Sequence, residues 1–323
     1  LINDDDLAYA KIRLDAASLQ VAIAHLSRID DPLARALVWG AAWDATRDAE
    51  TSASAYISLV LGNISAETES TTVRTTLGQL LLVARSYVAP ERRTETVTLV
   101  GTALWELAKA AEAGSDHQFQ FVKFFAAIAS THDHMAALRG LLDGGIALDG
   151  LEIDTDLRWE LLQGLVVGAA AGEAEIAAEL DRDATAKGQQ AAARLRAAIP
   201  TEAAKRAAFD ALAVASDADV PSNEIQRSIT MGFQHVADPS VLAAIVGPYF
   251  SSLERIWTSR SYQTAESFVI GLYPAPLASS LLADSTRAWL DANPDIPALR
   301  RLIAENLSGV ERALRAQARD QSA

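Results

Sequence analysis

The stretch DTDLRWELLQGLVVGAAAGEAEIAAELDRDATAKGQQAAARLRAAIPTEAAKRAAFDALA, residues Asp154–Ala213, decides the fold class. Leu157, Leu161 and Leu165 recur every four residues, which places them on one face of an α-helix. Asp154 or Thr155 is the expected N-cap, because a side-chain oxygen there can accept from the free amides of the first turn. The stretch therefore begins with an amphipathic helix that must bury its apolar face against neighbours.

Three more helices are predicted in the same stretch. Glu173–Leu180 is short and follows Gly172, which is expected to end the preceding helix. Thr185 is the expected N-cap of a helix that runs to Ile199, before Pro200, and Thr201 of the helix after it. Helix–turn–helix units of this size cannot bury an apolar face alone, so they stack on one another. The sequence predicts an all-α fold, a curved α-α superhelix of helical hairpins.

Helical patterns also cover the remainder of the chain, with a period of about 40 residues read from helix pairs. Trp39 and Trp43, four residues apart, are expected to pack in the core. A polar final helix is expected to cap the array. The other expected helical segments are Leu19–Ser27, Leu33–Asp48, Thr51–Leu61, Glu69–Val88, Arg92–Ala113, Ser115–Ala129, Met135–Leu142, Asn223–Gln234, Val241–Phe250, Leu253–Trp257, Tyr262–Tyr273, Pro274–Ala292 and Pro297–Ala318.

The first fifteen residues differ from everything after them. Leu7–Leu14 alternates in hydrophobicity with a period of two, which predicts a short strand or an extended segment. A single strand has no partner in an all-helical domain. We therefore expect residues 1–15 to be a junction from a missing upstream β-rich domain and residues 16–323 to be the helical-repeat domain. The initial Leu1, in place of methionine, also favours a piece of a longer protein.

Composition and charge exclude several function classes. With 28 Lys and Arg against 42 Asp and Glu, the net charge is −14, which repels nucleic acid and anionic lipid. No apolar run approaches the roughly 20 residues that span a bilayer. We expect neither nucleic acid nor a membrane as a partner. The Ala-rich and Asp-rich sequence without cysteine is typical of a bacterial cytoplasmic protein.

Few side chains have the spacing of a catalytic or metal site. The five histidines form no His-Glu-x-x-His motif, and His132-Asp133-His134 is expected to be a solvated turn between helices. No nucleophile–base pattern supports an independent hydrolase. The best candidates for a ligand-facing surface are Arg158, Trp159, Arg260 and Tyr262, because arginine binds carboxylates through a planar fork. The alternative is that Arg158 pairs with nearby acids and Trp159 packs inside.

Five segments together resemble the C-terminal domain of the aminopeptidase N family, the zinc alanyl aminopeptidases that include the endoplasmic-reticulum aminopeptidases. The resemblance covers essentially the full chain and is strongest to the enzymes of high-GC bacteria. The segments are NDDDLAYAKIRLD at Asn3–Asp15, LARALVWGAAWDATRD at Leu33–Asp48, GSDHQFQFV at Gly114–Val122, DTDLRWELL at Asp154–Leu162 and WTSRSYQTAESFVIGLYP at Trp257–Pro274.

The resemblance implies a noncatalytic bowl of HEAT-like hairpins that encloses the active-site cavity of a zinc metallopeptidase and helps to bind or size-select its peptide substrate. It places zinc, with all catalytic residues, in an upstream catalytic domain of the same polypeptide. The resemblance implies two binding partners for this domain, the upstream catalytic domain and the peptide substrate. Arg260 and Arg158 would suit recognition of the peptide carboxylate. This fragment alone is expected to be inactive. The alternative function is a free-standing helical-repeat adaptor that binds a partner protein.

Overall fold

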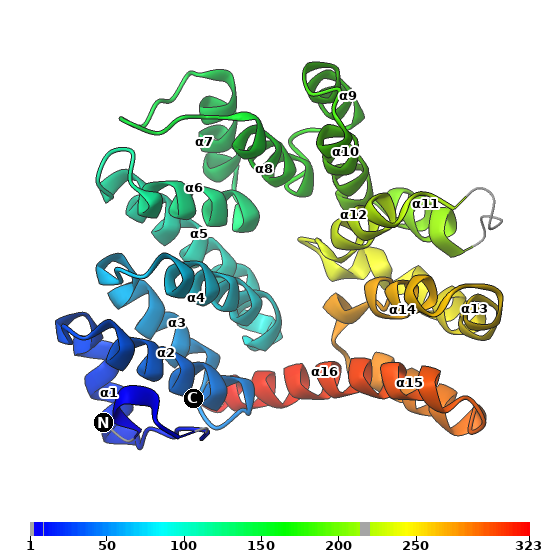
Figure 1. Cartoon of the computed structure of the whole chain (residues 1–323), viewed down its shortest axis with the longest axis horizontal. Coiled ribbons are helices and arrows are strands. Elements are labelled where there is room, and N and C mark those ends of the chain that lie inside the picture. The colour runs from blue at the N-terminus through cyan, green and yellow to red at the C-terminus, as the bar shows by residue number, and fades with distance from the viewer. Residues whose placement is uncertain (1–2, 9, 214–219) are drawn as a thin grey trace. The chain divides into compact units, whose positions relative to one another are not determined.

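The computed structural model describes residues 3–8, 10–213 and 220–323, and it is helical throughout (Figure 1). Sixteen α-helices account for most of the 77% helical content, and the described residues contain no strand. The expected all-α class is confirmed. The helices are α1 Ala16–His25, α2 Pro32–Arg47, α3 Ala53–Asn63, α4 Ser70–Leu82, α5 Arg93–Ala110, α6 Asp116–Ile128, α7 His132–Asp143, α8 Thr155–Val167, α9 Glu173–Arg182, α10 Ala186–Ala198, α11 Glu202–Ala213, α12 Asn223–Gln234, α13 Val246–Ser259, α14 Tyr262–Gly271, α15 Ser280–Ala292 and α16 Pro297–Gln321.

Shorter helical turns connect several of these helices. A π-helical turn, η4 Val83–Tyr87, extends α4, and a 3₁₀ helix, η6 Pro239–Ile245, leads into α13. The remaining turns are the 3₁₀ helices η1 Asp4–Asp6, η2 Leu26–Arg28, η3 Ile64–Ala66, η5 Pro90–Arg92 and η7 Ala275–Leu277.

Side-chain N-caps fix where many helices begin. The expected caps Asp154 and Thr185 accept from the amides of Leu157 at 2.8 Å and Gly188 at 3.2 Å. Thr201 accepts from the amide of Ala204, as expected for the beginning of α11. These local hydrogen bonds explain why the helix starts of this stretch follow from the sequence.

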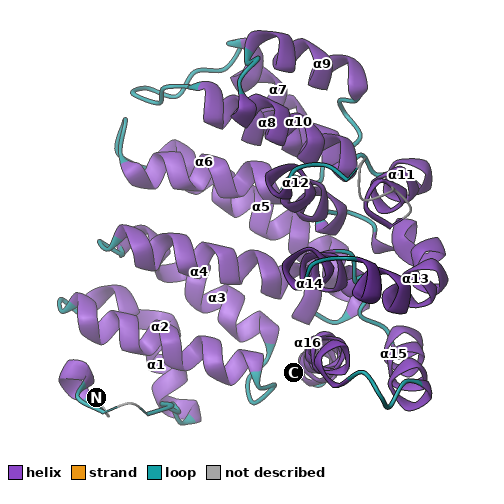
Figure 2. Ribbon diagram, turned by 45° about the vertical axis from the view of Figure 1, so that its right-hand side comes forward, coloured by secondary structure: helices purple, strands orange, loops and turns teal. Residues whose placement is uncertain are grey.

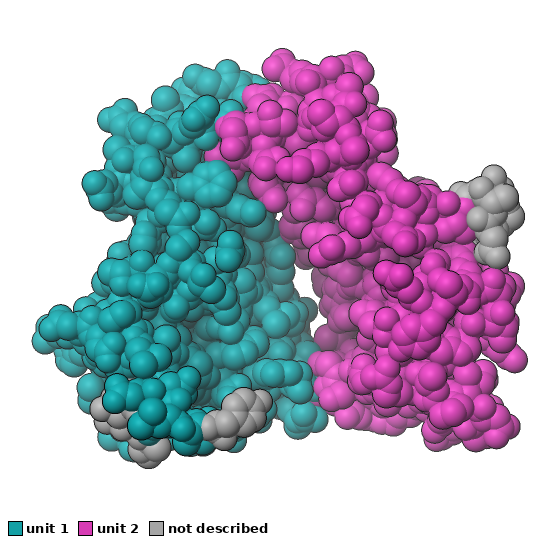
Figure 3. All heavy atoms as spheres, viewed as in Figure 1, with its two compact units in different colours: residues 1–153, 312–323 teal, residues 154–311 magenta. Residues whose placement is uncertain are grey.

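The chain divides into two compact units (Figure 3). Unit 1 comprises residues 1–153 and 312–323, and unit 2 comprises residues 154–311, so the division falls within α16. In unit 1, α1, α3 and α5 contact one another in one layer, and α2, α4 and α6 form a second layer (Figure 2). This layering is that of stacked helical hairpins.

Unit 2 repeats the two-layer pattern. Helices α8, α10, α12 and α14 follow one another in one layer, while α11 contacts η6 and α13 contacts α15 in the other. Gly232 of α12 lies against α10 so closely that a Cβ atom there would come within 1.9 Å of the carbonyl oxygen of Arg194. Only glycine permits that approach of the two backbones.

The amino-terminal segment forms no strand in its described residues. Residues 10–15 have no regular secondary structure, and Tyr9, in the middle of the expected strand, lies outside the described residues. The alternation has another cause: Ile12 is buried, whereas Lys11 and Arg13 both form ion pairs with Asp48 at the end of α2. The segment is therefore docked by charge on a helix end. Its origin as a domain junction stays a prediction.

Three predicted features differ from the structure. Helix α8 ends at Val167, not before Gly172, because Ala169 adopts φ 56° and the amide of Ala170 turns back to the carbonyl of Leu165 at 2.8 Å. Gly172 instead precedes α9. His132–His134 is the first turn of α7, with Thr131 as its N-cap, rather than an interhelical turn. The expected break after Phe250 is absent, since α13 continues to Ser259.

Within the described residues, no single helix has both the length and the apolarity to cross a bilayer. The neighbouring segments Asn223–Gln234 and Pro239–Ser259 reach that length only together, across a 120° bend.

Candidate functional site

Arg158 and Trp159 lie near the beginning of α8 and hold it to α9. The guanidinium of Arg158 donates from Nε and Nη2 to the two carboxylate oxygens of Glu179, at 2.6 and 2.7 Å. Trp159 is 4% exposed, and its indole N–H donates to Asp183 at 2.9 Å. Hydrogen bonds from Thr185 and then Trp159 lower the pKa of the Asp183 carboxyl. In this structure both side chains therefore have partners within unit 2.

Arg260 and Tyr262 lie at the turn between α13 and α14. Arg260 follows the last residue of α13 and is half-buried, and Ser261 is the N-cap of α14. Tyr262 is 50% exposed, and its ring meets that of Trp257 edge to face at 5.5 Å between centroids. Trp257 is half-buried, so the exposed ring of Tyr262, held by Trp257, is a surface on which a peptide side chain can pack.

The hydroxyl of Tyr262 joins α14 to α16. It donates to Glu266 at 3.1 Å and accepts from Nη2 of Arg301 at 3.2 Å. Arg301 also pairs with Glu305 at 3.0 Å, and the Glu305 charge is the first cause of the raised pKa of Arg301. We call Trp257, Tyr262, Glu266, Arg301 and Glu305 the Tyr262 cluster. It offers an aromatic surface, a cation and two carboxylates at the surface of unit 2.

The structure places the four predicted residues in two places. Arg158 and Trp159 belong to the α8–α9 hairpin, and Arg260 and Tyr262 belong to the α13–α14 hairpin. The sequence predicts only that the final helix is a polar cap and gives Arg301 no binding role, whereas the structure brings Arg301 to Tyr262. The only sequence signal was the spacing of Arg301 and Glu305, four residues apart on one helix, which is typical of many surface pairs.

The described residues offer no fitting site for zinc, the metal implied by the resemblance. No group of three or more His, Cys, Asp or Glu side chains there is arranged to hold a metal ion. The histidine cluster at His132–His134 is divided, because His134 is buried and accepts the amide of Ser130 at Nδ1. No chemical step is therefore assigned to a metal held by this part of the chain.

Comparison with known proteins identifies the domain. The model of the ERAP1-like C-terminal domain matches residues 1–312. Aminopeptidase N of Streptomyces lividans is 44% identical over 323 residues, which are 100% of this chain and 37% of that protein. The chain therefore spans little more than a third of the length of this relative, at its C-terminal end. With its stacked helical hairpins and a match over nearly its whole length, this chain belongs to the ERAP1-like C-terminal domain family.

Proposed function

We propose that this chain is the noncatalytic C-terminal lobe of a zinc aminopeptidase, which removes N-terminal residues from peptides. The observation that carries the proposal is the 44% identity, over the full chain, to the C-terminal part of an aminopeptidase N. In this proposal an upstream domain of the same polypeptide holds the zinc ion and the catalytic residues. The helical lobe encloses the active-site cavity and restricts which peptides enter it.

The sequence upstream of Leu1 distinguishes the two functions, a lobe of an aminopeptidase and a free-standing adaptor. We expect the reading frame to continue upstream and to encode a His-Glu-x-x-His motif with a further acidic ligand. A start codon beside Leu1, with no such motif, would support the free-standing adaptor instead. The isolated chain should show no peptidase activity with or without added zinc, whereas zinc-dependent hydrolysis by this chain would contradict the proposal.

The Tyr262 cluster, with the neighbouring Arg260, is the peptide-contacting surface in this proposal. Tyr262 supplies an exposed ring and Arg301 an exposed planar cation that suits a peptide carboxylate. Both Nη atoms of Arg260 are buried, so its contact with a peptide requires the side chain to move. Trp159 is buried and Arg158 is engaged by Glu179, so these two residues support the wall of the lobe, and contact with peptide by Arg158 requires displacement of Glu179.

Substrate length provides the functional test. In the full-length enzyme, the double substitution of Arg260 and Tyr262 by alanine should lower kcat/KM for a long peptide by roughly tenfold, a loss of about 1.4 kcal/mol in transition-state stabilisation. Hydrolysis of a single-residue amide, which is too short to reach the lobe, should stay unchanged. Equal losses for both substrates would contradict peptide binding here.

Two further variants separate binding from folding in the same assay. Arg206→Ala removes an exposed arginine of α11 whose partner, Asp210, lies one turn away, so neither substrate should be affected. Arg158→Ala leaves the buried Glu179 without its bidentate partner, so we expect a lower melting temperature with no discrimination between long and short substrates.

A further inference from the structure

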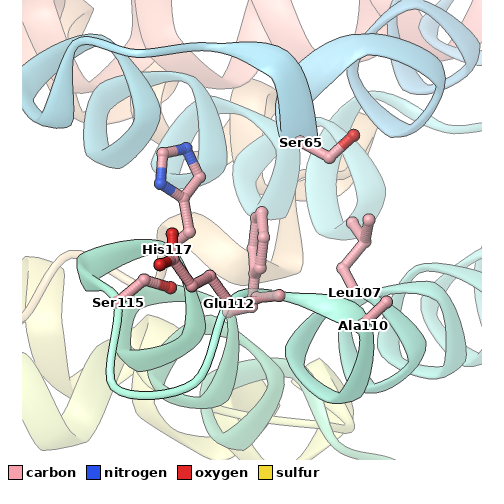
Figure 4. Close-up of a pocket in the computed structure, with 8 residues that line it drawn as sticks. Ser65, Leu107, Ala110, Glu112, Ser115 and His117 are labelled. Carbon is pink, nitrogen blue, oxygen red and sulfur yellow. The ribbon is translucent and has the colours of Figure 1, made fainter.

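A pocket of about 270 Å³ lies within unit 1, whereas the candidate peptide-binding residues belong to unit 2 (Figure 4). It is bounded by η3, by the last turns of α5 and by the beginning of α6. Its volume is just below the range of about 300–1,000 Å³ typical of ligand sites, so it suits only a small molecule. The lining residues are Ser65, Leu107, Ala110, Ala111, Glu112, Ser115, His117 and Phe121.

The two ends of the pocket differ in polarity. Glu112, Ser115 and His117 gather at one end, and Leu107 and Ala110 lie at the other, where Ser65 is the one polar side chain of the described lining residues (Figure 4). Phe121 also lines the pocket and is 1% exposed, so its ring is held in place by the core of unit 1. An occupant that matches this lining has one polar, charged end and one apolar end.

The polar end is rich in hydrogen-bond acceptors, and the Ser115 hydroxyl is both an acceptor and a donor. Glu112 is exposed, and its carboxylate forms no ion pair in the part of the chain that the structure describes. His117 Nε2 lies 2.6 Å from the backbone oxygen of Glu67, which can only accept, so Nε2 carries a proton and Nδ1 is the ring nitrogen left for an occupant. Ser115 already accepts from the amide of Gln118 as the N-cap of α6.

The charge at this end selects against anions. The first amides of α6 would attract an anion, but Glu112 and Asp116 lie at the same place, and the carboxylate of Asp116 is already engaged by Ser70 at 2.7 Å. Glu112 is the acid that faces the pocket and is not paired with a cation. A positively charged donor group therefore complements this end, and an ammonium, with three N–H donors, matches a set of acceptors.

We propose that this pocket binds a small organic ammonium ion that carries a short apolar tail. The ammonium donates to the Glu112 carboxylate and lies beside Ser115 and His117, and the tail covers Phe121 and extends to Leu107 and Ala110. Burial of the tail adds affinity that a bare ammonium lacks. The site is distinct from the Tyr262 cluster, and it does not depend on whether the parent protein is a peptidase.

A titration of the 323-residue chain with n-butylammonium chloride tests the proposal. Methyl NMR signals of Leu107 and Ala110 should shift saturably, because the butyl chain contacts both. Methylammonium lacks the tail and n-butanol lacks the charge, so each should bind at least about fivefold more weakly. Equal affinity of n-butanol and n-butylammonium, or no shift at these two methyl signals, would overturn the proposal.

Two matched substitutions test whether the Glu112 carboxylate binds the ammonium. Glu112→Gln is nearly isosteric at an exposed position, so the fold should be kept while the affinity for n-butylammonium falls about fivefold. Glu95→Gln removes the same charge from the exposed face of α5, outside the pocket, and should leave the affinity unchanged. An unchanged affinity in Glu112→Gln would overturn the proposal, as would equal losses in the two variants. Unchanged methyl spectra outside the pocket verify that each variant is folded.

Discussion

The most deeply buried charges of the two units are stabilised in opposite ways. In unit 1 the carboxylate of Asp320, on α16, is fully buried and accepts from the amide and hydroxyl of Ser54, at 2.9 and 2.8 Å, and from the amide of Ala89 at 3.0 Å. Arg92 adds a charged donor at 2.6 Å. Ser54 is in the first turn of α3, so an anion lies where helix amides have no intrahelical partner.

In unit 2 the most deeply buried charge is a cation, although the carboxylates of Glu179 and Asp183 are also buried. The Lys205 ammonium of α11 is fully buried and donates towards four backbone carbonyls, of Ala197 at 2.6 Å, Gly232 at 3.0 Å, Phe233 at 3.3 Å and His235 at 3.4 Å. These oxygens belong to the carboxyl ends of α10 and α12. Lys205 therefore joins two helix C-termini, just as Asp320 joins helix amides: each charge has the sign that its helix ends favour.

Neither the Asp320 carboxylate nor the Lys205 ammonium is stabilised mainly by a side chain of opposite charge. Unit 1 also holds a charge-paired carboxylate, Glu67, which accepts from Arg35 at 2.9 Å and from the indole of Trp39 at 2.8 Å. The hydrogen-bond acceptors of Lys205 in the described residues are all neutral carbonyls, and burial lowers its pKa to about 7. For Asp320, burial raises the pKa, but the hydrogen bonds from Ala89 and Ser54 and the charge of Arg92 outweigh it and lower the pKa.

The largest expected effect is that of Asp320→Ala. The substitution leaves the buried amide of Ala89 and the first-turn amide of Ser54 without an acceptor, and should lower the free energy of unfolding by about 3 kcal/mol. Hydrogen exchange measured by mass spectrometry should rise in α3 more than in α11. Faster exchange in both helices to the same degree would show that the two units do not differ as described.

Lys205→Met should have the next largest effect, about 2 kcal/mol, because the helix-end carbonyls of α10 and α12 lose a shared donor while the methionine keeps much of the packing. The faster exchange should now be in unit 2. Arg206→Met is the control. The guanidinium of Arg206, the residue next to Lys205, is exposed and pairs with Asp210 on the same helix, so the free energy of unfolding of this variant should stay close to that of the parent.

Ser54→Ala sharpens the account of unit 1. It removes the hydroxyl hydrogen bond to Asp320 and keeps the amide hydrogen bond, so we expect a loss of about 1 kcal/mol. Chemical denaturation of this variant and of Asp320→Ala, with the double variant, measures the coupling. Fully additive losses would show that the hydroxyl does not act through Asp320.

The smallest expected effect is a pH dependence that arises in unit 1. His134 is buried, accepts from the Ser130 amide at Nδ1 and lies 3.0 Å from the Thr102 hydroxyl, and burial lowers its pKa although Asp133 raises it. The unfolded chain therefore binds a proton first, and stability is lost as the pH falls below the unfolded value of about 6.5 towards the folded pKa.

Melting temperatures between pH 7 and pH 5 measure this loss. His134→Gln should flatten the slope, whereas His132→Gln, which changes an exposed histidine two residues earlier on α7, should keep it. A slope that both variants share with the parent would assign the pH dependence to other groups.

The sequence predicts helices well where their ends have a side-chain cap. Thr185 and Thr201 cap their helices as expected, and Asn223–Gln234 is predicted to the residue although its N-cap, Ser222, makes no side-chain cap hydrogen bond. The end of α8 is missed because the left-handed position after it is occupied by Ala169, an uncommon residue for that conformation, and not by glycine. The local sequence therefore does not predict the turn at Ala169, because it contains no residue that favours a left-handed conformation there.

The candidate site was less predictable than the fold. Residue type alone favoured Trp159, but its indole is buried against Asp183, and it favoured Tyr262, whose ring is half exposed. Trp159 lies on a helix face that packs against neighbouring helices, whereas Tyr262 lies on a face that is partly exposed to solvent. The approach of Arg301 to Tyr262, 39 residues apart, and the pocket beside Glu112 depend on how hairpins stack, which periodicity within one helix does not specify.

The position of Asp320 in the chain has a consequence for synthesis. Its carboxylate accepts hydrogen bonds from the amides of Ser54 and Ala89, which precede it in the chain by 266 and 231 residues. A ribosome adds roughly 5–20 residues per second, so the amino-terminal hairpins wait more than ten seconds for this carboxylate. Throughout that interval nascent unit 1 is incomplete, and it is then that chaperones or aggregation compete with folding.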